Sequence, residues 1–327
     1  MQEKSLAAII LDKAGKKKAA QEYIESIQQH LTNSEELGMY FDFNQNPFEW
    51  GCMHLTAHTA AIEAMDRVAH DNATVDEMNI WLLKQKQTQQ WDTPVSTTDA
   101  IYALLERGTQ ILANQGNVNL SFAGNTMNTT DKGAISGLGY IKQTFSDNQA
   151  IDTRSIKVEK KDAGIAWGAV YAQFKESIAH VKQQGSSAFN VKKQLYVKRT
   201  VNNVEELQPI RNSNTLKVGD VVVARLTIQL DRKMDFVQLK EQRGGCFEPM
   251  TALSGYHWSA GTGYYEEIKD ASTNFFFDSL SKGVYVLEIN YRVSHTGNYE
   301  VGLSTLQCAY APEFATHSDS MRIEIKP

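Results

Sequence analysis

The chain has 327 residues, and its 42% hydrophobic residues, 22% charged residues and 6 prolines are typical of a folded globular protein. Because this length exceeds one ordinary hydrophobic core, we expect two or three domains. The formal net charge of −5 disfavours nucleic acid as a partner, since phosphate binding requires a basic surface. No apolar run is long enough to cross a membrane.

The chain begins inside a helical pattern. Met1–Lys4 leads directly into it, without the apolar leader of a signal peptide and without a cap or a first strand. We therefore expect an excised part of a longer protein. The cysteines leave two interpretations open: Cys246 and Cys308 form a disulfide in an oxidising compartment, or they are two buried thiols. Cys52 is expected at a packed helix position.

Residues 1–112 are predicted to be helical, with one interruption. Apolar residues at helical spacing predict five helices: around Leu6–Ile10, ending near Gly15; from Ala20 to Leu31; over His54–Ala69; over Thr74–Lys86; and over Thr97–Arg107. Thr74 and Glu77 are expected to form a capping box, and Ile101, Leu104 and Leu105 to lie inside. Between the second and third helices, Met39–Phe43 alternates like a short strand or hairpin loop. Short antiparallel helices in series favour a helical-hairpin array, part of a solenoid or of an α/α toroid.

The period changes to that of strands beyond the boundary at Gly108–Gly116. Strands are predicted over Val118–Phe122, Gly137–Phe145, Ser155–Lys160 and Ile165–Phe174. Residues 116–185 thus form a small β module, whose core is small enough that it could pair with strands outside this chain. Gln183–Asn190 is expected to be a linker.

Residues 190–327 are predicted to form an antiparallel β-sandwich. The expected strands are Val191–Lys198, Val221–Leu230, Tyr299–Tyr310, Ser320–Ile325 and the two halves of Asn274–Arg292. A turn at Ser281–Gly283 divides Asn274–Arg292, which is interpreted as a hairpin. The fold class is therefore multidomain α plus all-β: a partial α/α toroid, a small β module and a C-terminal sandwich.

Motifs for catalysis or metal binding are incomplete. Ser254 lacks the preceding glycine of a nucleophile elbow. His54 and His58 have the spacing of two zinc ligands, but Leu55 stands where a zinc protease has glutamate, which favours a polar helix face. The adjacent carboxylates Glu266 and Glu267, with Asp270, are more typical of a wet loop than of a glycosidase pair. The sequence therefore predicts no catalytic residue, no cofactor and no metal.

One stretch has the composition of a recognition surface. Ser254–Tyr265 contains three tyrosines, a tryptophan, a histidine and three glycines. Aromatic side chains with a polar edge suit interfaces, and the candidate interface residues are Tyr256, Trp258, Tyr264 and Tyr265. The alternative is a long sandwich loop that folds back on its own aromatic side chains.

Several segments together resemble one family. Trp81–Lys86, Trp91 and Thr98–Leu105 resemble the late helices of the thioester domain of alpha-2-macroglobulins. A second group of segments resembles the last macroglobulin-like domain of the bacterial members. These segments are Leu216–Asp220, Asp235–Val237, Phe247–Pro249, Asn274–Arg292, Gly297–Tyr299 and Ala311–Phe314. The resemblance implies that residues 1–112 end a thioester-type α/α toroid and that residues 116–185 are the second half of the CUB-like domain into which the toroid is inserted. Residues 190–327 would be the last macroglobulin-like domain.

The same resemblance implies a function. The family entraps a broad range of proteases after cleavage of a bait region, often with covalent capture by an internal thioester. The partners would be the remainder of the parent chain and, through the full-length protein, proteases. The location would be periplasmic, outer-membrane-anchored or secreted. The aromatic stretch Tyr256–Tyr265 would pack against the thioester domain and shield the reactive bond from water.

The reactive centre of that family is missing from this sequence. A thioester requires Cys-Gly-Glu-Gln, whereas Leu55, Pro249 and Ala311 stand three residues after Cys52, Cys246 and Cys308. The resemblance therefore implies a non-catalytic part that contributes packing.

Two other interpretations stay open. The helices could form an α/α-barrel enzyme, because Gln90-Trp91 resembles one Gln-Trp repeat of the terpene cyclases; this would require an acidic cluster, and no Asp-rich motif occurs between Ser5 and Leu112. The sandwich could instead be a carbohydrate- or cell-surface-binding module, with the aromatic residues of Tyr256–Tyr265 stacked on sugars.

Overall fold

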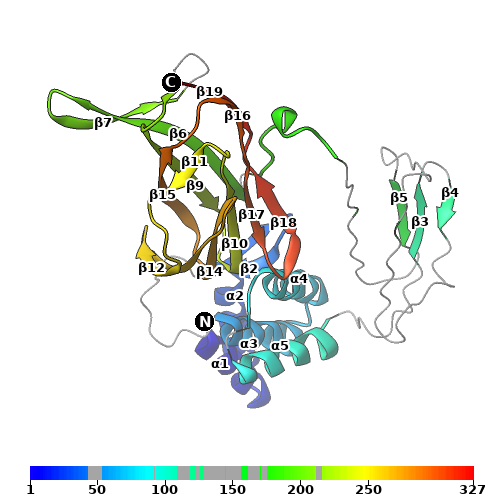
Figure 1. The fold of residues 1–327 in the computed structure, drawn as a ribbon. Helices are drawn as coiled ribbons and strands as arrows, with labels where there is room; N and C mark the ends of the chain where they lie inside the picture. Colours follow the sequence, from blue (N-terminus) through cyan, green and yellow to red (C-terminus); the bar gives the residue numbers. More distant parts are fainter. Residues whose placement is uncertain are drawn as a thin grey trace. The chain divides into compact units, whose positions relative to one another are not determined.

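The structure is a computed structural model, and it describes residues 1–42, 54–91, 93–108, 118–122, 125–127, 144, 156–160, 170, 175–186, 188–210 and 216–327 (Figure 1). The chain divides into two compact units, one of Met1–Lys86 with Trp91–Val170 and one of Gln87–Gln90 with Tyr171–Pro327. None of the described helices is both long and apolar enough to cross a membrane.

The first unit begins with the helices α1 (Gln2–Lys13) and α2 (Lys17–Gln28) and continues with α3 (His54–Ala64), α4 (Asn72–Thr88) and α5 (Pro94–Glu106). A π-helical turn (Met65–Ala69) extends α3 at its C-terminal end. Between α2 and α3 lies a hairpin of β1 (Leu31–Ser34) and β2 (Gly38–Phe41). The helix boundaries follow local capping. The side chain of Asp71 accepts the N–H of Thr74 at 3.1 Å, and the side chain of Thr93 accepts the N–H of Ser96 at 3.1 Å.

Four details of the helical prediction are wrong. Leu31 starts β1 rather than ending a helix, and Asp71 caps α4 in place of Thr74, because its carboxylate binds both the N–H and the hydroxyl of Thr74. Ile101 and Leu105 are exposed, whereas Ala100, Ala103 and Leu104 of the same helix are buried. The apolar stripe of α5 is therefore wider than the face that this unit covers.

A buried arginine fixes α3 to the end of α5. The Arg107 guanidinium donates to Asp66 at 2.8 Å and to Glu63 at 3.1 Å, and it lies 5.2 Å from the Tyr102 ring. Its backbone carbonyl accepts from the Asn79 side chain at 3.2 Å, which adds α4 to the same junction. The core of the unit is formed by Ile24, Ile27, Ile62, Met65, Met78 and Leu82.

A small antiparallel sheet follows, with the order β4 (Asn125–Met127), β3 (Val118–Phe122) and β5 (Ile156–Lys160). The predicted strands Val118–Phe122 and Ser155–Lys160 are confirmed as β3 and β5, which pair from Val118↔Lys160 to Phe122↔Ile156. The predicted strands Gly137–Phe145 and Ile165–Phe174 lie outside the described residues, apart from single positions, and Cys52 also lies outside them.

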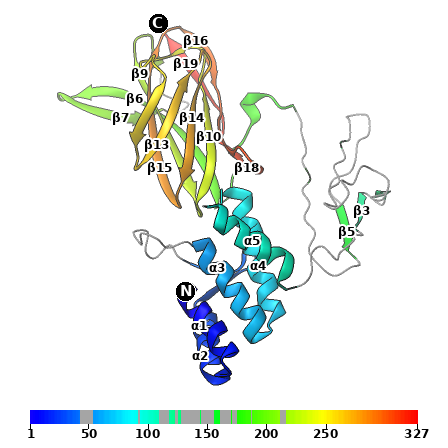
Figure 2. The same cartoon turned by 90° about the horizontal axis from the view of Figure 1, so that it is seen from below.

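The C-terminal part is a sandwich of two main sheets (Figures 1 and 2). The six-stranded sheet has the order β12 (Gly255–Ser259), β13 (Thr262–Ile268), β14 (Ser272–Leu280), β10 (Met234–Gln242), β17 (Ser304–Cys308) and β18 (Ala311–His317). The five-stranded sheet has the order β11 (Phe247–Pro249), β15 (Gly283–Val293), β9 (Val221–Leu230), β6 (Phe189–Val201) and β7 (Val204–Pro209). A third sheet consists of β16 (Gly297–Val301), β19 (Met321–Lys326) and β8 (Leu216–Lys217), in which β8 and β19 pair in parallel.

One core lies between the two main sheets. Val191, Leu195 and Val197 alternate inward from β6, and Leu226, Ile228 and Leu230 from β9. From the other sheet, Leu239, Phe275 and Phe277 complete the same cluster. The predicted antiparallel sandwich is thus confirmed, apart from the parallel pair of β8 and β19.

Three predictions about this domain are wrong in detail. Asn274–Arg292 is not a hairpin, because β14 pairs with β10 and β13 while β15 pairs with β9 and β11, so the turn at Ser281–Gly283 connects the two sheets. Tyr299–Tyr310 holds two strands, β16 and β17. The expected linker at Gln183–Asn190 is partly structured: Gln184 bridges His317, and Phe189 begins β6.

Candidate functional site

The aromatic stretch is a β-hairpin at the edge of the six-stranded sheet, not a loop. β12 and β13 pair from Gly255↔Glu266 to Ser259↔Thr262 around a two-residue turn. Both turn residues are left-handed, with φ of 52° at Ala260 and 77° at Gly261, as in a type I′ turn. Such a turn matches the twist of the flanking strands, so it aligns the aromatic residues of β12 and β13 side by side.

The outer face of this hairpin carries exposed rings. Tyr256 is 84% exposed and Trp258 is 78% exposed, whereas Tyr265 is half-buried. The rings of Tyr256 and its cross-strand partner Tyr265 meet edge-on, with centroids 5.0 Å apart. Trp258 lies opposite Gly263, and a Cβ on that glycine would stand 3.1 Å from the Trp258 ring. The glycine thus leaves room for the indole to lie on the strand.

Tyr264 points the other way. Its ring packs on Phe275 and Phe277, with centroids 5.6 and 5.5 Å apart, and it belongs to the sandwich core. Its hydroxyl lies 3.0 Å from the Ser259 hydroxyl. The structure therefore separates the four candidate interface residues: Tyr256, Trp258 and Tyr265 share one face, and Tyr264 anchors the hairpin from beneath.

An ionisable pair lies on the inner side of the hairpin. His257 Nε2 is 3.3 Å from the Glu266 carboxylate, and its ring stacks on Tyr264 at 5.8 Å. Burial raises the pKa of Glu266, and His257 opposes that shift. The pair joins β12 to β13 at the edge of the core.

An open depression of about 930 Å³ adjoins the hairpin. Its lining combines aromatic rings with a carboxylate and hydroxyl groups: Tyr256, Trp258, Tyr265, Phe276, Asp278, Ser279 and Ser281 are among the lining residues. This mixture is suited to recognition, because rings supply contact area and polar groups fix orientation.

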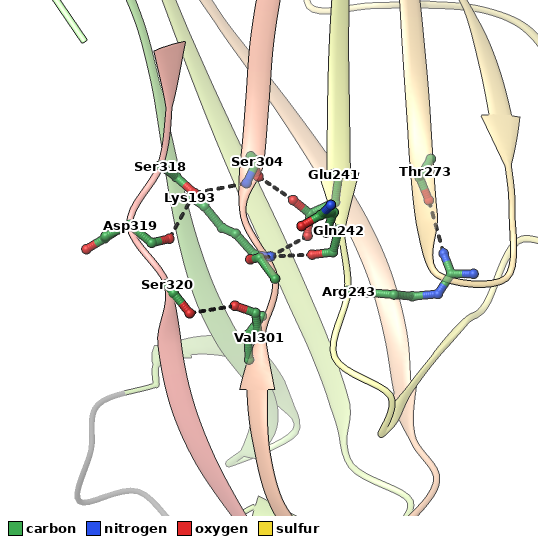
Figure 3. Close-up of polar contacts among 11 residues, drawn as sticks. Lys193, Glu241, Gln242, Arg243, Thr273, Val301, Ser304, Ser318, Asp319 and Ser320 are labelled. Atoms are coloured by element: carbon green, nitrogen blue, oxygen red, sulfur yellow. Dashed lines mark hydrogen bonds and ion pairs between the residues drawn. The ribbon is translucent and has the colours of Figure 1, made fainter. Parts of the chain in front are cut away.

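A second polar feature lies inside the sandwich (Figure 3). Lys193 of β6 reaches to β10 of the opposite sheet, where its Nζ lies 2.6 Å from the Glu241 carboxylate. Both side chains are buried, with 5% and 0% exposed. The same ammonium donates to the carbonyls of Gln242 and Gly302, each at 2.8 Å. The ammonium is therefore surrounded by one carboxylate and two backbone carbonyls.

Serine hydroxyls extend this network to Ser304 of β17 and to Ser318, the residue after β18. The Ser304 hydroxyl bonds to Glu241, and the Ser304 N–H donates to the Ser318 hydroxyl at 3.0 Å. Burial raises the pKa of Glu241, and the nearby Lys193 ammonium opposes the shift. Burial, and then the Glu241 charge, also raise the pKa of Tyr291. With its donors occupied by fixed acceptors, Lys193 ties the two sheets together and is not presented to a substrate.

Sequence reasoning missed this network, although the alternation contained a signal. Val191, Lys193, Leu195 and Val197 have the same parity along β6, and Val237, Leu239 and Glu241 have the same parity along β10. A charge at an inward position of each strand indicates a buried pair once the register is known.

The comparisons bear on the domain that holds both features. Residues 189–313 match the family model of the bacterial alpha-2-macroglobulin MG10 domain. This part of the chain is therefore similar to the bacterial alpha-2-macroglobulin MG10 domain, and the term MG10 domain refers to it from here on. The MG10 match includes β6 to β17, and with them the hairpin β12–β13 and the residues Lys193, Glu241 and Ser304.

Several of the solved structures similar to the chain are bacterial alpha-2-macroglobulins. Salmonella alpha-2-macroglobulin reacted with methylamine is 13% identical, with a TM-score of 0.36, over 98% of this chain and 19% of that one. Escherichia coli alpha-2-macroglobulin activated by porcine elastase is 10% identical, with a TM-score of 0.40, over 100% of this chain and 28% of that one. The chain thus spans less than a third of the length of either protein. Comparison with curated protein sequences gave no match.

The remaining polar residues singled out in the sequence have structural partners. In the MG10 domain the Ser254 hydroxyl accepts the N–H of Ile268 at 2.9 Å. Glu266 and Glu267 are consecutive on β13 and point to opposite faces, so they do not form a carboxylate pair. The backbone carbonyl of Asp270 accepts from Arg243 at 2.7 Å.

The histidine pair of α3 is divided between surface and core. His54 is exposed, whereas His58 is fully buried between Phe41 and Trp81, with its Nε2 3.0 Å from the Met78 carbonyl. Burial lowers the pKa of His58 to about 4. The interpretation as a polar helix face is therefore wrong for His58, because its ring fills a gap between aromatic residues.

Both described cysteines are free and buried, which confirms the interpretation as buried thiols for Cys246 and Cys308 and rules out a bridge between them in this structure. Burial raises the pKa of Cys246 to about 11, so its thiol is unreactive at neutral pH. The Cys308 thiol donates to the Asp235 carbonyl at 3.3 Å.

Proposed function

We propose that the chain is the non-catalytic C-terminal part of a bacterial alpha-2-macroglobulin-like inhibitor that entraps proteases. The observation that carries this proposal is the match of residues 189–313 to the bacterial MG10 domain. Within this function the chain contributes packing between domains, and the parent protein acts in the periplasm, on the outer membrane or outside the cell.

Exposed apolar residues on the helices support the proposal that the helical unit belongs to a larger helical array. The α5 helix buries Ala100, Ala103 and Leu104 on one side and exposes Val95, Ile101, Tyr102 and Leu105 on the other. On α1, Leu6 and Ile10 are likewise exposed. Helices with apolar residues on two sides are typical of buried positions. We propose that residues 1–112 end a thioester-type α/α toroid and that residues 116–185 belong to a CUB-like domain.

The aromatic face is the proposed contact between domains. Tyr256 and Trp258 are exposed and Tyr265 is half-buried beside them, so these rings are available to a neighbouring domain. In the parent protein they would cover the thioester region, if the parent has one, and limit its contact with water. Tyr264 would act through the hairpin, because its own ring lies in the core.

The test of entrapment uses the full-length parent protein. We expect trypsin incubated with the parent to keep its activity on a small chromogenic peptide while losing activity on a large protein substrate. The isolated 327-residue chain, as the control, should change neither activity. Equal loss on both substrates, or loss on neither, would contradict the proposal.

A second candidate function is supported by Trp258. Its exposed indole lies on Gly263 and lines the same depression as the carboxylate of Asp278 and the hydroxyl of Ser279 on β14, a mixture that suits stacking on a sugar ring. Glycan-array binding by the chain, lost in Trp258→Ala, would favour a carbohydrate-binding module. If the unchanged chain gives no more array signal than Trp258→Ala, protease entrapment is the better explanation.

A further inference from the structure

The strand β15 is only partly paired on one of its two sides. On one side β9 pairs with it regularly over Gly283–Arg292. On the other side β11 pairs with Tyr291–Val293 only, and the Met250 N–H donates to the Asn290 carbonyl. Within the described residues, no strand lies along this side of Gly283–Ile289. This stretch is therefore an open edge of the five-stranded sheet.

The open edge lacks the usual protection against a further strand. Exposed edges template pairing with other chains, and proteins blunt them with proline, charged residues, bulges or covering segments. At the two ends of the same sheet, β11 contains Pro249 and β7 contains Pro209, in each case together with glutamate. Gly283–Ile289 has no proline, and Glu288 is its only charged residue. Its regular register with β9 means that no bulge turns it away.

The outer face of this edge carries two valines between a cation and a carboxylate. Val284 and Val286 are 63% and 43% exposed. Lys282 precedes the strand and Glu288 follows the valines at the same parity, and both are exposed. The Arg225 guanidinium of β9 lies 2.7 Å from the Glu288 carboxylate, which is still 42% exposed. That carboxylate is thus held on the outer face and stays accessible to a cation from across the edge.

This pattern is complementary to itself when it runs antiparallel. If two copies of the strand pair about a twofold axis at Tyr285, Lys282 of one copy lies opposite Glu288 of the other, and Val284 lies opposite Val286. Each of these pairs occurs twice. Opposite charges and β-branched residues stabilise an antiparallel pair when they stand directly opposite each other, whereas like charges destabilise it. With an axis one or two residues away, Lys282 faces a residue without a carboxylate. The charges therefore fit a second copy of this chain in one register.

We propose that the chain forms a homodimer in which β15 pairs antiparallel with β15 of a second copy, about a twofold axis at Tyr285. Main-chain hydrogen bonds along the open edge supply affinity, and the two pairs of Lys282 with Glu288 fix the register. Because a contact of one short strand buries little area, we expect a dissociation constant on the order of 100 µM. This association goes beyond protease entrapment and does not depend on it.

The experiment is sedimentation equilibrium of the 327-residue chain over about 5–500 µM, a range that brackets the expected dissociation constant. We expect a monomer–dimer equilibrium. Lys282→Glu places glutamate opposite Glu288 and should weaken it at least about tenfold, and Glu288→Lys should do the same with two lysines. In an equimolar mixture of the two variants each new charge meets its opposite, so the mixture should dimerise although neither variant does so alone.

Lys192→Glu is the matched control. It makes the same change of charge at an exposed position of the same sheet, on β6, which β9 separates from β15. It should leave the dimer unchanged. Circular dichroism of all three variants checks that they fold.

Four outcomes would overturn the proposal: a chain that stays monomeric over the whole range, a dimer that Lys282→Glu does not weaken, a mixture of the two variants that stays monomeric, or equal weakening by Lys192→Glu. A dimer formed through the exposed apolar residues of the helices would give the second of these outcomes. Loss of entrapment by the parent protein would leave the association of this chain unaffected.

Discussion

Lys193 is the residue whose replacement should be most costly to the MG10 domain. Lys193→Met removes the ammonium that lies 2.6 Å from the buried Glu241 carboxylate and leaves this carboxylate with only the weaker electrostatic support of Arg243 among the described residues. Breaking a buried pair in this way costs about 3–5 kcal/mol. We expect urea unfolding, followed by circular dichroism, to show a loss of this size in the free energy of unfolding.

The neighbouring lysine provides the control for this prediction. Lys192 is exposed on the opposite face of β6, and Lys192→Met should change stability by no more than about 0.5 kcal/mol. The double variant Lys193→Met with Glu241→Leu should recover much of the loss, because it removes both charges. A double variant less stable than Lys193→Met would show that the network stabilises through more than its charges.

The burial of His58 predicts that the stability of the helical unit depends on pH. Its pKa falls from an ordinary 6.5 to about 4 on folding, so the unfolded chain binds the proton more tightly. The stabilisation is present above pH 6.5 and is lost as the pH falls toward 4, by up to about 3 kcal/mol. In His58→Gln this part of the dependence should disappear.

The measurement is amide hydrogen exchange of α3, compared between the two proteins at pH 7 and pH 5. The difference between them isolates His58 from carboxylates such as Asp71, whose pKa is also lowered and which lose stabilisation in the same direction. A His58→Gln protein with the same loss of protection at pH 5 would refute the assignment.

At the scale of the element, the hairpin β12–β13 should depend on its inner ring and not on its outer ones. Tyr264→Ala leaves a cavity beside Phe275 and Phe277 and should destabilise the sandwich by about 3–5 kcal/mol. Tyr256→Ala removes a ring that is 84% exposed and should cost no more than about 0.5 kcal/mol. Thermal unfolding of both variants tests this; similar costs would mean that the outer rings also hold the hairpin.

The sequence predicts elements of this chain better than it predicts their partners. The strand patterns of β14 and β15 are plain, because Phe275, Phe277, Leu287 and Ile289 alternate with exposed residues. A short turn between two such strands is compatible with a hairpin and with a connection between two sheets that enclose one core. Since both arrangements bury the same residues, local periodicity does not distinguish them.

In the candidate site, too, the sequence predicts the segment but not the contacts of its residues. Composition identified Ser254–Tyr265 as a recognition stretch, but the assignment of its rings to two faces required the strand register, in which Tyr264 and Tyr265 point apart. The Lys193–Glu241 pair was not predicted because it joins residues on different sheets, which only the tertiary fold brings together. On the helices, α5 was predicted close to its place, but the expected burial of Ile101 and Leu105 was wrong, because their burial depends on neighbours that the sequence does not specify.

At the scale of the whole molecule, the chain holds two separate hydrophobic cores. The helical cluster around Ile62 and the sandwich cluster around Leu226 share no residue. Residues that share one hydrophobic core generally unfold together. The equilibrium unfolding of a chain with two separate cores therefore departs from a two-state transition. We therefore expect differential scanning calorimetry of the 327-residue chain to resolve two transitions.

Core variants assign each transition to its unit. Ile62→Ala should lower one transition and Leu226→Ala the other, because each removes methyl groups from a fully buried site at a cost of about 2–5 kcal/mol. For units of this size such a loss corresponds to a shift of roughly 4 °C or more in the affected transition, while the second stays in place. If either variant moved both transitions together, the two cores would unfold as one, and a single cooperative unit would replace the two units described above.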